Sequence, residues 1–234
     1  MARRGWNAER LFYTGMGCAI LVTVFIGFAP SFYLRRTGTP LPPLLLVHGS
    51  AFSSWLLLFI AQTGLVAAGR TDVHRRVGVL GGVLAIAMLG LGTLTALRSV
   101  AGLSGPDLRS QLAFLAIPLF DMVAFPVLVG MALARRRVPQ AHKRLMLIAT
   151  IGILSPATGR IPWPDAWRGT LTDFVVPDLF LLPLVAWDLK TRGRLHPMTI
   201  FGGLFLIASQ ILRMALSGTD AWLRFAEWAT GLVA

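Results

Sequence analysis

The sequence predicts an all-α, polytopic membrane protein with seven transmembrane helices, a cytoplasmic N-terminus and a C-terminal amphipathic helix. Of its 234 residues, 55% are hydrophobic and only 14% are charged, which is too apolar for a soluble domain of this length. The mean hydropathy is +0.69. Runs of about 20 residues are apolar on every face, as spans of a hydrocarbon core about 30 Å thick must be.

Seven apolar runs are separated by clusters of charged residues, proline and glycine, which are typical of helix boundaries. The first run is longer than the apolar segment of a signal peptide, so we expect it to be retained as a span. The tail, 219–233, is short and amphipathic and is expected to lie on the membrane surface. We expect one helical-bundle domain over 1–234. The predicted spans are 11–34, 43–68, 73–97, 109–134, 140–160, 171–189 and 196–217.

The basic residues predict how the chain is oriented. The loops on one side of the seven spans, including Arg3 and Arg4, carry 14 Lys or Arg residues, and those on the other side carry seven. Because Lys and Arg in short loops are retained in the cytoplasm, we expect a cytoplasmic N-terminus in a bacterial inner membrane.

The overall charge and the cysteine content exclude other classes. The net charge is +12, but the cations form short clusters between apolar runs, so the lipid bilayer is expected as a partner and nucleic acid is not. The single cysteine, Cys18, lies in the first run and can form neither an intrachain disulfide nor a Cys-based zinc site.

Three histidines, His74, His142 and His196, begin the third, fifth and seventh predicted spans at the cytoplasmic side. Taken singly, each is typical of an interfacial anchor beside cations that extend to lipid phosphates. Taken together, two of them could ligate a b-type haem from opposite faces. The cations placed to pair with the haem propionates are Arg75, Arg76, Lys143 and Arg144.

The same histidines offer an alternative metal site. Three imidazoles completed by Asp188 or by Asp72 could hold zinc or iron with an open position. No HExxH or comparable local spacing is present, so this hypothesis depends on the inferred depth of the residues alone.

A second polar set lies deeper in the predicted spans or near their other end. His48, Trp55 and Gln62 are spaced seven residues apart on the second span and form one stripe. This stripe could line a pathway or a helix–helix contact. Ionisable groups inside a membrane usually face a cavity or a partner, and we expect Arg160 to pair with Asp178. The prolines of the fourth, fifth and sixth spans would kink those helices around this set. Its members are His48, Trp55, Gln62, Asp121, Arg160 and Asp178.

Four short elements between about 44 and 160 resemble a family of uncharacterised bacterial membrane proteins described only as a domain of unknown function. The family is similar to b-type membrane cytochromes in having single histidines on successive helices, and the resemblance therefore implies a haem role. The elements are VHG at 47–49, HRxxG (His74, Arg75, Gly78), H-K/R-R-x-M (His142 to Met146) and Arg160 at the end of a span.

The leading functional hypothesis is a membrane redox protein that binds haem b through two of the cytoplasmic histidines and passes electrons to a quinone or a partner subunit. The main alternative is a transporter or channel whose polar pathway includes the deeper set. A membrane metalloenzyme and a structural subunit of a larger membrane complex are further alternatives, so the sequence leaves open whether the chain is an enzyme.

Overall fold

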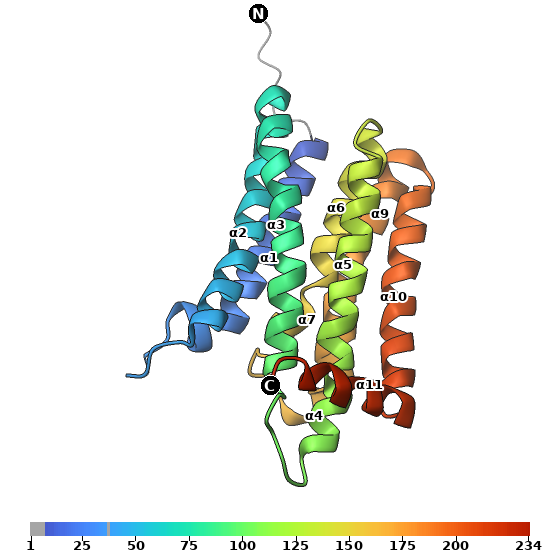
Figure 1. Ribbon diagram of the computed structural model, residues 1–234. Helices are drawn as coiled ribbons and strands as arrows, with labels where there is room; N and C mark the ends of the chain where they lie inside the picture. Colours follow the sequence, from blue (N-terminus) through green and yellow to red (C-terminus); the bar gives the residue numbers. More distant parts are fainter. Residues whose placement is uncertain (1–7, 37) are drawn as a thin grey trace, which may run out of the picture. The chain divides into compact units, whose positions relative to one another are not determined.

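The computed structural model describes residues 8–36 and 38–234, and all regular secondary structure in this part of the chain is helical. Contacts divide the chain into two compact units, which Figure 1 shows as ribbons. Unit 1 comprises Met1–Met88 and Leu154–Pro177, and unit 2 comprises Leu89–Ile153 and Asp178–Ala234. The prediction of one domain over the whole chain stays a prediction.

Five stretches of helix among the described residues are long and apolar enough to cross a membrane. This agrees with a membrane-embedded, multi-span protein. The predicted boundaries of these five spans are close to those observed. The five are α1 (Ala8–Phe28) with the π-helix η1 (Ala29–Tyr33), α2 (Pro43–Ala67), α3 (Thr71–Arg98), α4 (Leu108–Phe114) with α5 (Ala116–Ala134), and α10 (Pro197–Ser217).

The prediction of seven spans is not confirmed, because the other two apolar runs form broken helices. The run 140–160 forms α6 (Pro139–Gly152) and α7 (Ser155–Thr158). Pro156 has no N–H to donate to Gly152, four residues earlier, so α6 ends there. The run 171–189 forms a π-helix η3 (Leu171–Val175), α8 (Val176–Leu179) and α9 (Leu181–Arg192). Pro183 similarly deprives the Leu179 carbonyl of its helical donor, and α8 ends at that residue.

In unit 1, α1 packs along α2 and against α7. Small residues allow these close approaches, since a Cβ at Gly27 would collide with the Ala157 carbonyl of α7. Polar contacts fix both ends of the α1–α2 pair. Arg10 donates to the Ala67 carbonyl at 2.8 Å, and the Tyr33 and Ser53 hydroxyls are 2.6 Å apart.

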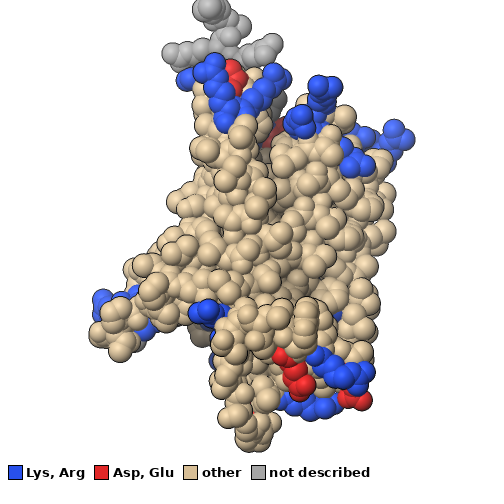
Figure 2. Space-filling model, viewed as in Figure 1, with Lys and Arg blue, Asp and Glu red and all other residues tan. Residues whose placement is uncertain are grey.

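In unit 2, α5 and α6 form an antiparallel pair, and α10 packs against both. Gly202 of α10 lies against Ile148 of α6, where an added Cβ would meet the Ile148 side chain at 2.7 Å. Figure 2 shows Lys and Arg side chains gathered at the end of unit 2 that holds the α5–α6 and α9–α10 turns. The predicted orientation stays a prediction, and Arg3 and Arg4, on which it partly depends, lie outside the described residues.

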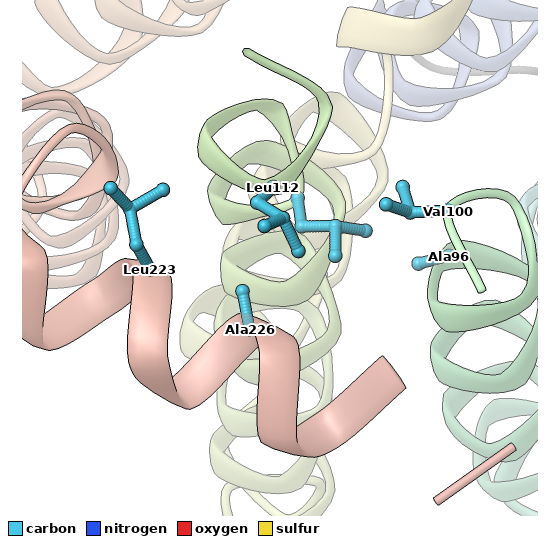
Figure 3. Packing of buried hydrophobic residues seen from close by; sticks show 6 residues of the cluster. Ala96, Val100, Leu112, Leu223 and Ala226 are labelled. Carbon is cyan, nitrogen blue, oxygen red and sulfur yellow. The ribbon is translucent and has the colours of Figure 1, made fainter. Parts of the chain in front are cut away.

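The tail forms α11 (Asp220–Gly231), whose first turn is capped by the Thr219 hydroxyl, 3.2 Å from the Trp222 backbone N–H. One face of α11 covers α4. Leu223 and Ala226 pack with Leu112 in a cluster that also contains Ala96 of α3 and Val100, which follows α3 (Figure 3). The predicted amphipathic helix is therefore present. Its other face exposes Phe225 and Trp228. The membrane-surface position of this helix stays a prediction.

Candidate functional site

The most deeply buried charges of unit 2 form two Arg–Asp pairs. Arg144, Asp188, Arg213 and Asp121 are each at most 3% exposed, and the two arginines are among the largest fully buried side chains. A buried charge is strongly unfavourable unless it is paired and hydrogen-bonded, so each pair must hold its helices in a fixed arrangement or serve a function.

The first pair joins α5 to α10 inside two apolar spans. Arg213 Nη1 donates to Asp121 Oδ1 at 2.6 Å and to the Ile117 carbonyl at 3.2 Å. Its Nη2 and Nε lie 3.4 Å from the hydroxyl and carbonyl oxygens of Ser209. Asp121 is a sequence-predicted site residue, whereas Arg213 is not. The sequence feature that could have identified Arg213 is its position as a lone cation within the last apolar run.

A second carboxylate lies beside this pair. Gln210 Nε2, on α10, donates to Asp178 Oδ1 at 3.0 Å, and the charge of Arg213 also acts on Asp178. Residues 209 and 210 precede residue 213 by four and three positions, so all three lie toward one face of the helix. We call Asp121, Asp178, Ser209, Gln210 and Arg213 the α10 cluster. It holds two carboxylates and one guanidinium.

Asp178 reaches the cluster from a discontinuous helix. It lies on the four-residue α8, between the π-helix η3 and the break at Phe180. Pro177 directly precedes it, and the ring of Pro177 removes one backbone N–H from the helical ladder. Discontinuous helices inside membrane proteins occur where backbone lines a protein-buried or water-filled site.

The second pair joins α6 to α9, and every polar atom of its carboxylate is bonded. Arg144 donates to Asp188 Oδ1 from Nε at 3.0 Å and also from Nη2. Asp188 Oδ2 accepts from the Thr199 hydroxyl at 2.6 Å and from the His196 backbone N–H at 2.9 Å. Arg144 Nη1 donates to Gln140 Oε1 at 2.5 Å. We call these five residues the Arg144 network.

Three members of the Arg144 network are sequence-predicted site residues, and two of them, Arg144 and Asp188, have other partners than those predicted. We predicted Arg144 as an interfacial partner for haem propionates and Asp188 as a metal ligand. Arg144 is instead 1% exposed because its face of α6 is covered by α9 and α10, and both oxygens of Asp188 are occupied by protein donors. The two residues thus bind each other.

The cytoplasmic histidines that we predicted as ligands differ in their tautomers. His142 Nδ1 lies 2.9 Å from the Ala132 carbonyl, which can only accept, so Nδ1 carries the proton and Nε2 offers its lone pair. His196 is the N-cap of α10, and its Nδ1 accepts from the Met198 N–H at 3.0 Å. A neutral His196 therefore carries its proton on Nε2, the nitrogen that a metal would need.

In unit 1, His74 is bonded in the same sense as His196. Gln62 finds complementary partners when its amide nitrogen donates to His74 Nδ1 at 2.7 Å and its oxygen accepts from the Gly78 N–H at 2.8 Å. The neighbours of Gln62 on the predicted stripe have other roles, because Trp55 is buried in the core and His48 stacks on Phe52 with ring centroids 4.3 Å apart.

These bonds test how well the three histidines fit a haem or a metal. Ligation by an imidazole Nε2 requires the proton to be on Nδ1, as it is in His142. His196 would have to lose its cap bond from Met198, and His74 would have to lose the bond that Gln62 donates in its complementary orientation, so His142 alone of the three already has this tautomer. In the described part of the chain, no three His, Cys, Asp or Glu side chains are grouped so as to hold a metal ion. Arg75, Arg76 and Asp72 are exposed at the start of α3, and Lys143 is partly buried on α6.

Arg160, in unit 1, has other partners than the predicted Asp178. Its guanidinium lies 4.7 Å from the centroid of the Phe28 ring, its Nη1 donates to the Pro156 carbonyl at 2.6 Å, and it interacts electrostatically with Asp173. Asp173 lies on η3 with Oδ1 against Gly159, where a Cβ would collide with it. Asp173 is not among the predicted site residues, although it is an acidic residue in the same apolar run as Asp178.

Comparison of this chain with family models, with curated proteins and with solved structures gives no match. The resemblance based on the short histidine elements therefore stays a prediction.

Proposed function

We propose that this chain is a membrane transport protein that moves protons through unit 2, with Asp178 of the α10 cluster as the group that binds and releases them. The observation that supports this is the charge of the cluster. With both carboxylates ionised, two negative charges oppose one guanidinium among apolar helices. An unneutralised charge in this environment is unfavourable by several kcal/mol, and binding one proton removes it.

The hydrogen bonds of the cluster favour Asp178 over Asp121 as the proton carrier. Asp121 accepts a charge-assisted bond from Arg213 at 2.6 Å and is almost completely buried. Asp178 accepts from the neutral amide of Gln210 at 3.0 Å and is only partly buried. A charged donor stabilises the ionised carboxylate more than a neutral donor does, so Asp178 should take up a proton more readily than Asp121.

Protonation of Asp178 can change the structure, because Asp178 lies on the short helix α8 and its charge determines how strongly Arg213 attracts it. When Asp178 is protonated, the guanidinium of Arg213 has one anionic partner, Asp121. When Asp178 is ionised, Arg213 is attracted to two carboxylates, one on α5 and one on α8. Since α8 is a four-residue segment between a π-helix and the interruption at Phe180, it can move without distorting a long regular helix.

A flux assay tests the proposal without knowledge of a co-transported solute. The full chain is reconstituted into liposomes that contain a pH-sensitive dye, and a valinomycin-induced potassium potential drives protons inward. We expect faster acidification than in protein-free liposomes, and we expect Asp178→Asn to abolish the difference. Asp220→Asn, which changes an exposed carboxylate of unit 2, is the matched control and should keep the wild-type rate. Wild-type flux equal to that of protein-free liposomes would overturn the proposal.

Infrared difference spectroscopy supplies a second, independent measurement. A pH titration of the reconstituted chain should reveal a carboxylic acid band that Asp178→Asn removes and Asp220→Asn leaves in place. A spectrum that Asp178→Asn does not change would assign the proton to another group.

We expect this protein to lie in the bacterial cytoplasmic membrane with its N-terminus inside, as the Lys and Arg residues of the turns favour.

One contact favours a second candidate function, a redox protein that holds a b-type haem and passes electrons to a quinone or a partner subunit. The bond from His142 Nδ1 to the Ala132 carbonyl gives His142 the tautomer that haem and metal ligands have. Visible spectra of the purified protein, oxidised and then reduced with dithionite, test it. Sharpened reduced bands that His142→Ala removes and His196→Asn preserves would support His142 as a ligand, and featureless spectra from haem-replete cells would exclude this candidate.

A further inference from the structure

Unit 2 has a concave site where α4 meets α11, outside the α10 cluster. A pocket of about 260 Å³ lies there, with Arg109 and Glu227 among its lining residues and Leu108, Leu112 and Leu223 as its apolar part. The volume would hold on the order of nine waters at about 30 Å³ each, which is the size of a small polar headgroup. Figure 2 shows basic and acidic side chains close together at this end of unit 2.

The pocket lies at the end of a membrane span, at the depth where lipid headgroups are found. Leu108 is the first residue of the apolar stretch formed by α4 and α5. Trp222 of α11 donates its indole N–H to the Leu112 carbonyl at 2.9 Å, which fixes α11 across the start of that span. Phe225 and Trp228 remain exposed on α11, as aromatic residues of the membrane interface are. The charged residues of the pocket, Arg109 and Glu227, are exposed at this end of the span, whereas Leu112 and Leu223 form its buried apolar floor and Leu108 is only partly buried.

The two charged residues of the pocket have opposite signs and weak existing contacts. Arg109 forms an exposed ion pair with Asp220 at 3.5 Å, a kind of contact that contributes little. Glu227 has no ion-pair partner among the described residues. A guanidinium suits a phosphate and a carboxylate suits an ammonium group, so the pocket matches a ligand that carries both charges.

We infer that this pocket binds the headgroup of phosphatidylethanolamine, with the phosphate on Arg109, the ammonium on Glu227 and an acyl chain beside Leu108, the partly exposed leucine of the pocket. The position of the pocket at the end of an apolar span, beside the exposed Phe225 and Trp228 of α11, favours the intact lipid over a free phosphoethanolamine in water. The inference is independent of the proton-transport proposal, since it uses no residue of the α10 cluster.

The test measures thermal stabilisation of the detergent-solubilised full chain by added lipids of three kinds. Phosphatidylethanolamine offers phosphate and ammonium, phosphatidylcholine has a methylated ammonium without N–H donors, and phosphatidylglycerol has the phosphate alone. We expect phosphatidylethanolamine to bind about threefold to tenfold more tightly than the other two. Glu227→Gln should remove this preference, and Arg109→Gln should weaken binding of all three lipids.

Controls separate the site from general effects of charge. Arg224 lies on α11, as Glu227 does, but does not line the pocket, and Asp165 is an exposed carboxylate of unit 1. Arg224→Gln and Asp165→Asn should therefore both keep the wild-type preference for phosphatidylethanolamine. Both pocket residues are exposed, so the lipid-free melting temperature of each variant should equal that of the wild type and show that it folds. Equal binding of the three lipids by the wild-type chain, or an unchanged preference in Glu227→Gln, would overturn the inference. Equal stabilisation by soluble phosphoethanolamine would overturn its assignment to a membrane lipid.

Discussion

The two buried Arg–Asp pairs of unit 2 differ in how completely their carboxylates are neutralised. Asp188 accepts two N–H groups of Arg144, a hydroxyl and a backbone N–H, so both of its oxygens are bonded. Asp121 accepts one charged donor, and a second carboxylate, Asp178, shares its cluster. A fully bonded pair has no alternative partner, whereas an incompletely neutralised cluster can exchange partners and protons. We therefore expect the Arg144 network to be structural and the α10 cluster to be functional.

The largest effect is expected from breaking the fully bonded pair. Asp188→Asn keeps the size of the side chain but leaves the Arg144 charge buried beside a neutral amide. We expect the free energy of unfolding in detergent micelles to fall by about 3–5 kcal/mol. Asp72→Asn, which removes an exposed ion pair of 3.9 Å with Arg70, should change it by about 0–1 kcal/mol.

A double replacement distinguishes loss of the pair from loss of space. Arg144→Met with Asp188→Leu removes both charges and restores apolar packing, so we expect it to recover most of the stability lost in Asp188→Asn. A structural role for the network would be contradicted if Asp188→Asn melted at the wild-type temperature.

The next largest effect is expected in the α10 cluster, and it should depend on both carboxylates. Asp121→Asn should destabilise the protein by only about 1–3 kcal/mol, because Arg213 can turn toward Asp178. Asp121→Asn with Asp178→Asn leaves Arg213 without an anionic partner, and its cost should exceed the sum of the two single costs. A double-mutant cycle of unfolding free energies measures this coupling. Additive costs would mean that Arg213 does not share the two carboxylates.

Single hydroxyl groups provide a smaller test of the same contrast. Thr199→Val removes a bond of 2.6 Å to a buried carboxylate and should cost about 1–2 kcal/mol. Ser209→Ala removes a hydroxyl that is 3.4 Å from Arg213 Nη2, a long contact, and should cost about 0.5 kcal/mol. Unfolding measured in the same detergent compares them directly. A larger cost for Ser209→Ala than for Thr199→Val would reverse the proposed division of roles.

The sequence predicted the long apolar helices well, because composition alone determines whether a run can lie in a bilayer. It predicted continuous spans at 140–160 and 171–189, where the structure has breaks. Pro156 and Pro183 were visible as candidate kinks, but a proline in an apolar helix can bend it or end it. Which outcome occurs depends on whether neighbouring groups bond the freed carbonyls, and that information is tertiary.

The sequence predicted the members of the site better than their pairing. Asp121 and Asp178 were identified because acidic residues are rare in apolar runs. Their contacts with Arg213 and Gln210 depend on which helices are neighbours. Arg144 was read as an interfacial cation because it stands beside a histidine and a lysine, yet packing of α6 against α9 buries it.

The smallest expected effect concerns pH and the His196 cap of the Arg144 network. Burial lowers the pKa of His196 below its ordinary value of 6.5, and the charges of Arg144, Arg192 and Lys143 lower it further against the opposing effect of Asp188. The folded state therefore binds a proton on His196 less readily than the unfolded state does. Above pH 6.5 the ring is neutral in both states, and as the pH falls from there toward the lowered pKa, stability is lost.

The geometry of the cap explains why protonation is unfavourable. His196 Nδ1 accepts from the Met198 N–H at 3.0 Å, and a protonated Nδ1 cannot accept. His196→Asn keeps a side-chain acceptor at the N-cap but does not titrate, so it should melt at a less pH-dependent temperature than the wild type between about pH 8 and about pH 5. All other acid-sensitive groups are common to the two proteins, and the difference between their melting curves isolates His196. Identical pH dependence in both would mean that the cap contributes no pH sensitivity.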